Sequence, residues 1–260
     1  MSYEQKAREE IAAWERQLFK PPGWLERASK TIGARINGLL PPKAHRIITT
    51  TIKSIVRTAL FGAEYTPQRP VQRNLDLEAN DQEAKRLFSL YQKIAVAEGA
   101  GTGAGGLILN VVDFPALIAI KMKYLFELAH HYGYDTKHFS ERVFILKVFQ
   151  LTFSGPEQRA KLLQAIKNWR SEEALWSADR DYSKNMDWET FQKEYRDAID
   201  FRKLLQMVPG IGAVAGAWAN YTILEELGQT ATNAYRMRRL NEGTTTRGQQ
   251  KPPDHLTSPA

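Results

Sequence analysis

The chain has 260 residues, of which 43% are hydrophobic and 25% are charged, and it contains no cysteine. These values exclude a fully disordered chain and a collagen-like repeat, and the missing cysteines exclude disulfide bonds and cysteine-based metal or redox chemistry. The formal net charge is +7, and residues 20–57 account for all of it, with eight lysines and arginines against one acid, Glu26. The charged N-terminus lacks the apolar core of a signal peptide, so we expect a cytoplasmic protein.

Helical spacing of apolar residues begins at the N-terminus and continues through the positively charged region. The first helix is expected over residues 3–19, and two more are expected over residues 24–40 and 46–60, which we call the basic helix pair. In the second of these, Arg46, Lys53 and Arg57 fall on a different side from the apolar residues. Such helices bind anionic lipid, nucleic acid or an acidic partner, although a solvated helix face around an ordinary core has the same pattern.

Of these partners, nucleic acid is the least favoured, because no recognised nucleic-acid-binding motif accompanies the charge. We therefore predict that the basic helix pair binds an anionic membrane surface or a membrane protein. The candidate binding residues are one tryptophan and seven cations: Trp24, Arg27, Lys30, Arg35, Lys43, Arg46, Lys53 and Arg57.

The rest of the chain is predicted to be helical as well. After a proline-containing connector at residues 62–70, helices are expected from Asp76 onward and over residues 114–132, 140–153, 156–176, 188–207 and 209–240. Gly133 suits a helix C-terminus and Pro156 suits a first helical turn. The polar residues 241–260 predict a disordered tail. The sequence therefore predicts an all-α, multi-helix single domain at residues 1–240.

Two apolar segments are rich in glycine and alanine. Residues 99–106 contain five glycines, each of which costs about 0.8–1 kcal/mol relative to alanine in a solvated helix. The segment is therefore either a loop or a helix that packs very closely against another. Gly101 and Gly105 are four residues apart, as are Gly212 and Gly216 in the second segment, so we favour two closely packed small-residue helices. Asn220 is expected to form a hydrogen bond between helices.

Neither segment predicts nucleotide binding or a clear membrane span. Residues 101–106 match G-x-G-x-x-G, but they follow a helical pattern instead of a strand, so we predict no nucleotide or other cofactor. Residues 99–120 are long enough to span a bilayer. They are only weakly hydrophobic, however, and their central carboxylate, Asp113, costs at least about 2.5 kcal/mol in a bilayer. We favour helices packed within the protein, with shallow hairpin insertion as the alternative.

The best candidates for catalysis are two carboxylates beside these apolar residues, Glu98 and Asp113. If burial raised the pKa of either, it would act as a general acid, as in a hydrolase. We favour structural roles instead, in which Glu98 bonds the glycine-rich turn and Asp113 caps a helix N-terminus before Phe114-Pro115.

Other polar residues give weaker signals. No metal site is predicted, because the spacing of His130, His131 and His138 does not place ligands on one helix face. Near the end of the last helix, Arg236, Arg238 and Arg239 are expected to extend the basic surface or to complement the helix dipole.

Taken in order, several of these segments resemble the EcsC family of bacterial proteins. The similarity extends over residues 3–240, and no single motif in it is diagnostic. The segments that carry it include the opening tryptophan-containing helix, Phe61-Gly62, residues 98–106, Asp113-Phe114-Pro115, Tyr132-Gly133-Tyr134-Asp135, residues 209–213, Asn220 and residues 235–240.

This resemblance implies a bacterial protein encoded with an ABC transporter that influences secretion, protein processing and competence, and it transfers no catalytic residue. Together with the charge pattern, it favours a non-enzymatic accessory protein at the inner face of the membrane, docking on anionic lipid or on a transporter. The alternative is a hydrolase that uses Glu98 or Asp113 beside the glycine-rich segment. No small-molecule substrate is identified.

Overall fold

The computed structural model describes residues 1–20, 50, 56, 59–60, 66–68, 70–71, 75–102, 114–177 and 212–249. These ranges contain helices and no β-strand, which confirms the predicted all-α class. The helices are α1 (Tyr3–Leu18), α4 (Leu77–Thr102), α6 (Phe114–His131), α7 (Phe139–Phe153), α8 (Pro156–Lys167), α9 (Trp169–Ser177) and α13 (Gly212–Gln249).

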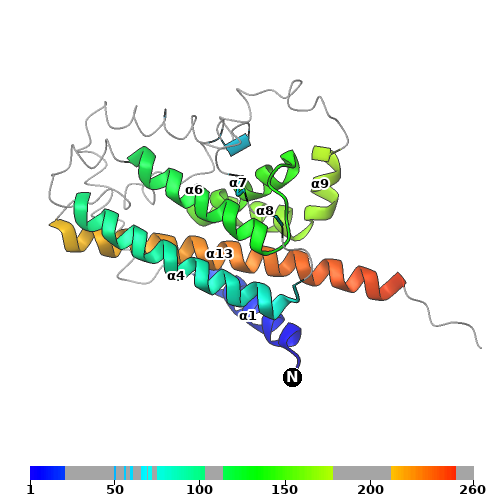
Figure 1. Cartoon of the computed structure of the whole chain (residues 1–260). Helices are drawn as coiled ribbons and strands as arrows, with labels where there is room; N and C mark the ends of the chain where they lie inside the picture. The colour runs from blue at the N-terminus through cyan, green and yellow to red at the C-terminus, as the bar shows by residue number, and fades with distance from the viewer. Residues whose placement is uncertain are drawn as a thin grey trace, which may run out of the picture.

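The long helix α13 is the centre of the arrangement. It packs against α1, α4, α6, α7 and α8. Figure 1 shows α1 and α4 on one side of α13 and the group α6 to α9 on the other, with α4 running alongside α13 in the opposite direction. A residue on α13 can therefore contact either group of helices, depending on the side of the helix from which it projects.

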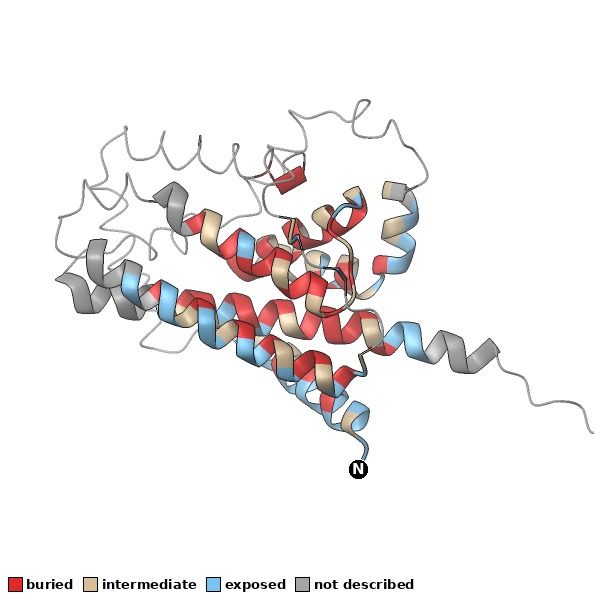
Figure 2. Ribbon diagram, in the orientation of Figure 1, coloured by how far each residue is buried: buried red, intermediate tan, exposed pale blue. Residues whose placement is uncertain are grey.

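One continuous apolar core joins these helices (Figure 2). Helix α1 contributes Ala7, Ile11 and Trp14, which recur at the four- and three-residue steps of one helix face. Helix α7 is buried on nearly all sides, since eleven of its fifteen residues are buried. A helix that is apolar all round belongs in the interior, and α7 lies between α13, α6, α8 and α9.

Several helix ends are fixed by local hydrogen bonds and backbone conformation. The Ser2 hydroxyl accepts a hydrogen bond from the Gln5 amide (3.2 Å) and caps α1. The Asp76 carboxylate accepts one from the Ala79 amide (2.8 Å) at the start of α4. Gly133 has φ 94°, a left-handed conformation that favours glycine, and it follows the end of α6 as expected.

Two predicted boundaries were wrong. The helix expected over residues 156–176 is divided at Asn168, whose φ of −95° and ψ of 23° close α8 while its carbonyl accepts from the Ser171 amide at the start of α9. The last helix continues past Leu240 to Gln249. Adding turns to an existing helix avoids the unfavourable free energy of helix nucleation. In addition, the Tyr134 hydroxyl donates a hydrogen bond to Glu242 (3.1 Å) in the first added turn. Residues 250–260 lie outside the described ranges.

The apolar residues of α4 are not all buried. Leu87 and Tyr91 are buried, whereas Leu90 is 54% and Ile94 36% exposed. The buried face also includes Leu77, Asn80, Asp81 and Ala84. Polar residues therefore occupy part of the buried side of this helix, and one of them forms the centre of the site described below.

Within the described helices, none combines the length and the apolar character that crossing a bilayer requires.

Candidate functional site

Two arginines near the end of α13 are almost fully buried, Arg236 (8% exposed) and Arg238 (6% exposed). Because they are two positions apart on a helix, they project in different directions from α13. Arg236 contacts side chains of α1 and α4, and Arg238 contacts a side chain of α7. The two arginines thus join α13 to the helix groups on both of its sides.

Arg236 lies in a cluster with Asp81, Tyr3, Tyr132 and Glu10, which we call the Asp81 cluster. The Arg236 Nε atom donates to the Asp81 carboxylate (2.8 Å), and its Nη1 atom donates to Glu10 on α1 (2.9 Å). The hydroxyls of Tyr3 (2.6 Å) and Tyr132 also donate to Asp81. A carboxylate that is only 1% exposed is thereby hydrogen-bonded from three separate segments of the chain.

These contacts fix the charge states within the cluster. Burial lowers the pKa of Arg236, but the hydrogen bond and charge of Asp81 outweigh it, so the pKa is raised above its ordinary value. Burial, with the hydrogen bond to Asp81, raises the pKa of Tyr3 to about 12. Burial and the Asp81 charge also raise the pKa of Tyr132 well above its ordinary value. Both tyrosines therefore remain protonated hydrogen-bond donors at neutral pH.

Arg238 forms the second cluster, with Glu141 on α7, and we call it the Glu141 cluster. Two parallel hydrogen bonds, of 2.6 and 2.8 Å, join the guanidinium to the Glu141 carboxylate. The guanidinium carbon lies 3.8 Å from the ring centre of Tyr134, 4.6 Å from that of Phe144 and 5.8 Å from that of Trp169. Aromatic faces thus surround the cation where water would otherwise hydrate it.

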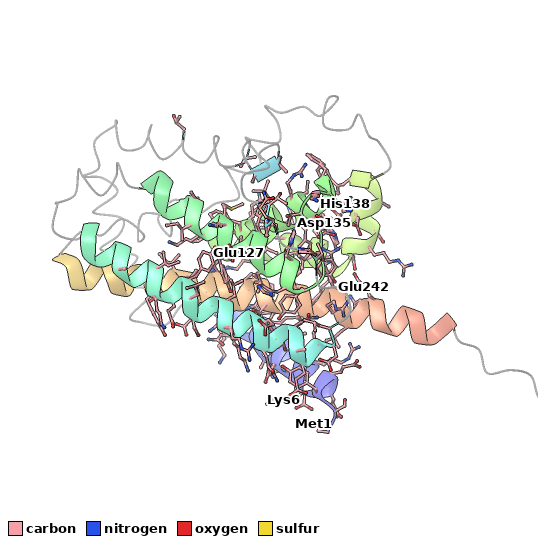
Figure 3. All side chains as sticks on the ribbon, in the orientation of Figure 1. Met1, Lys6, Glu127, Asp135, His138 and Glu242 are labelled. Carbon is pink, nitrogen blue, oxygen red and sulfur yellow. The ribbon has the colours of Figure 1, made fainter. Side chains whose placement is uncertain are left out.

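The contacts in the two clusters are those of a structural role, in which paired charges hold helices together. In each, a buried carboxylate is neutralised by a buried guanidinium, so neither charge is left uncompensated in the core. The stacked rings of Tyr132, Tyr235 and Tyr134 connect the clusters, with adjacent ring centres 5.4 Å apart. In Figure 3, Asp135 and His138 lie on the turn between α6 and α7, and Glu242 lies on α13 nearby.

The prediction that these arginines extend the basic surface was wrong for Arg236 and Arg238. Their partners Asp81 and Glu141 lie 155 and 97 residues away, a separation that local patterning does not reveal. Arg239 is partly buried and donates to the Leu75 carbonyl (2.9 Å). The sequence contains a signal that Asp81 is buried. Asp81 follows Leu77 by four residues and precedes Ala84 by three, so it shares the buried side of α4.

Within the basic helix pair, the structure describes only residues 50, 56, 59 and 60. Thr50 is helical and exposed, whereas Val56, Ala59 and Leu60 are helical and fully buried. Arg142 on α7 donates to the Leu60 carbonyl (2.8 Å). The candidate binding residues themselves lie outside the described ranges: Trp24, Arg27, Lys30, Arg35, Lys43, Arg46, Lys53 and Arg57.

The glycine segments are described at the level of the backbone. Gly101 lies in α4, and Gly212, Gly216 and Asn220 lie in α13, so these positions are helical instead of looped. Helices α4 and α13 pack against each other along their length. The side-chain surroundings of these positions are not described and Gly105 lies outside the described ranges, so their close packing stays a prediction.

The surroundings of the two candidate catalytic carboxylates are not described either. Glu98 lies in α4, but its side-chain environment is not described, and Asp113 lies outside the described ranges. Among the residues that the structure describes, no group of three or more histidine, aspartate or glutamate side chains is placed to share a metal ion.

The chain is similar to a protein family and to two proteins of one bacterial strain. The model of the EcsC protein family matches residues 5–240. Protein EcsC of Bacillus subtilis strain 168 is 39% identical over 242 residues, which cover 93% of this chain and 98% of that protein. The uncharacterized protein YdbA of the same strain is 34% identical over 174 residues, which cover 65% of this chain and 61% of that protein. No solved structure matches the chain.

Proposed function

We propose that this chain, which belongs to the EcsC family, is a non-enzymatic accessory protein that binds an anionic membrane surface. The binding residues in this proposal are the cations of the basic helix pair, and the membrane face is the cytoplasmic one. The observation that carries the proposal is the confinement of the entire +7 net charge to residues 20–57. Excess charge gathered in one segment attracts an oppositely charged surface far better than the same charge spread over the molecule.

The described residues of the second basic helix support this choice. Val56, Ala59 and Leu60 are buried while Thr50 is exposed, so the apolar side of the helix serves the core of the protein. With helical spacing, Arg46, Lys53 and Arg57 are four residues before and three and seven residues after Thr50. We therefore expect these three cations, which we call the cationic stripe, to run along the side of Thr50, with the buried Leu60, seven residues after Lys53, at the edge of the stripe.

If the buried apolar side does not insert into the membrane, the binding free energy depends on the number of cations near the membrane surface. Each lysine or arginine near an anionic membrane contributes about 1 kcal/mol at physiological salt. The three cations of the stripe then contribute about 3 kcal/mol, or roughly a hundredfold in affinity. Because the Debye length shortens from about 10 Å at 0.1 M salt to about 3 Å at 1 M, added salt should abolish most of the binding.

Co-flotation with vesicles tests the proposal directly. We expect the full chain to float with vesicles that contain phosphatidylserine, to float much less with neutral phosphatidylcholine vesicles, and to be released from the former by salt. Equal absence of binding to both vesicle types would reject binding to lipid. Retention of the chain on membranes that carry their proteins, together with that result, would assign the docking to a membrane protein such as a transporter.

A further inference from the structure

Two buried hydrogen-bond donors beside the Glu141 cluster have no hydrogen-bond partner among the residues that the structure describes. They are the hydroxyl of Tyr235 on α13 and the indole N–H of Trp169 on α9. Both side chains are almost fully buried, at 1% and 2% exposure. A buried donor without an acceptor has given up its bond to water on folding and has gained nothing in exchange, so such groups are rare in native proteins.

Both donors belong to residues that surround the ion pair of Arg238 and Glu141. The ring of Phe144 is their common neighbour, because its centre lies 5.1 Å from the ring centre of Tyr235 and 5.0 Å from that of Trp169. The same ring centre lies 4.6 Å from the guanidinium carbon of Arg238. The two donors are therefore features of one cluster, to which α7, α9 and α13 all contribute (Figure 1).

The Tyr235 hydroxyl lies in the electric field of the Glu141 carboxylate. Burial raises the pKa of Tyr235 well above its ordinary value, and the charge of Glu141 raises it further, whereas the charge of Arg238 lowers it. The hydroxyl therefore stays protonated at neutral pH and remains a donor. Among the described residues, however, Glu141 accepts hydrogen bonds only from Arg238, one on each carboxylate oxygen.

The Asp81 cluster shows how a buried carboxylate can be satisfied more completely by protein groups. Asp81 accepts hydrogen bonds from the hydroxyls of Tyr3 and Tyr132 as well as from Arg236. A carboxylate has about four lone-pair sites, and Arg238 occupies only two of those on Glu141. Unused acceptor sites on Glu141 thus occur in the same cluster as two donors that lack an acceptor.

A group that meets both needs must accept hydrogen bonds from a hydroxyl and an indole and also donate to a carboxylate. A metal or ammonium ion accepts no hydrogen bond, and an anion would be repelled by the charge of Glu141. Water accepts and donates, and buried waters typically make about three hydrogen bonds to polar groups that the protein leaves unsatisfied.

We infer that the Glu141 cluster contains a buried water site, in which water accepts hydrogen bonds from the Tyr235 hydroxyl and the Trp169 indole and donates to Glu141. The site completes the polar network that joins α7, α9 and α13. The inference is independent of the proposed membrane binding, since its tests involve no vesicles.

A crystal structure of the full chain in which ordered waters are resolved tests the site directly. We expect electron density for a water within about 3.2 Å of the Tyr235 hydroxyl and of a Glu141 oxygen. The Trp169 indole should bond the same water or a second one beside it. Absence of such density, or a direct hydrogen bond from Tyr235 to Glu141, would overturn the inference.

Removal of the hydroxyl gives a second test, in solution. Tyr235→Phe should raise the equilibrium constant for urea unfolding about fivefold, because the water then loses a partner. Without a bound water, the substitution would instead remove an unsatisfied buried group, and the constant would stay unchanged or fall. That result would overturn the inference.

Tyr132→Phe is the matched control for this measurement. The Tyr132 ring stacks on that of Tyr235, with ring centres 5.4 Å apart, but its hydroxyl donates directly to Asp81. Its loss should raise the unfolding constant at least as much as Tyr235→Phe does, which shows that the assay detects a lost hydrogen bond of a buried tyrosine. Should Tyr235→Phe fail to fold, the electron density of the wild-type protein decides.

Discussion

Replacing Arg238 by methionine tests whether the Glu141 cluster has the energetics of a buried ion pair. The substitution keeps much of the side-chain length but leaves the Glu141 carboxylate, 5% exposed, without its cation. Breaking a buried pair by removing one partner costs about 3–5 kcal/mol. Against a typical total stability of about 5–15 kcal/mol, this loss should strongly lower the midpoint of urea unfolding measured by circular dichroism.

A surface pair on α4 provides the control for this prediction. Arg86 and Glu83 have the same 2.6 Å separation as Arg238 Nη1 and Glu141, but the Arg86 side chain is 74% exposed. Arg86→Met should therefore cost less than about 1 kcal/mol, since exposed pairs are screened by water. The double variant Arg238→Met/Glu141→Leu should recover most of the stability lost by Arg238→Met alone, because it removes the unpaired carboxylate. Equal losses for Arg238→Met and Arg86→Met would refute the reasoning.

Two further predictions concern packing and pH. A Cβ atom at Gly228 would lie 3.0 Å from both a ring carbon of Phe88 and the hydroxyl of the buried Tyr124, so Gly228→Ala should destabilise the protein by about 1–3 kcal/mol. Gly155→Ala, which meets nothing within 4 Å and has φ −70°, should change the stability by less than about 1 kcal/mol in the same urea-unfolding assay. In the native state the pKa of Tyr3 is raised from 10.0 to about 12, so the stability it contributes is complete below pH 10 and is lost as the pH rises toward 12. Tyr3→Phe should make the fall in unfolding free energy over this range shallower, and an unchanged slope would contradict the assignment.

The parts of the fold that the sequence predicts correctly depend on local chemistry. Apolar spacing located α1 through Ile11 and Trp14, and Gly133 marked the end of α6, because a helix face and a left-handed turn are both determined by a few neighbouring residues. The division at Asn168 was not predicted, because asparagine occurs both inside helices and at their ends. Its presence alone therefore does not mark a helix boundary.

The candidate site was the least predictable feature, because its energetics depend on partners distant in the chain. Arg236 and Arg238 have the local context of surface residues at a helix C-terminus, and only the packing of α4 and α7 against α13 brings Asp81 and Glu141 to them. The same applies to Arg142, whose carbonyl partner Leu60 is 82 residues away. Compensation of buried charge is a property of the assembled core and cannot be read from residue spacing alone.

The central claim, that the cationic stripe binds the membrane, is tested most directly by comparing two charge-reversed variants in one vesicle titration. Arg46→Glu/Lys53→Glu/Arg57→Glu reverses the stripe. Lys6→Glu/Lys85→Glu/Lys93→Glu reverses three exposed lysines of α1 and α4, with the same change in net charge. The account predicts that reversing the stripe weakens binding to phosphatidylserine vesicles by at least a hundredfold while the control changes it only a few fold. Equal weakening in both variants would contradict it, because net charge alone would then explain the binding.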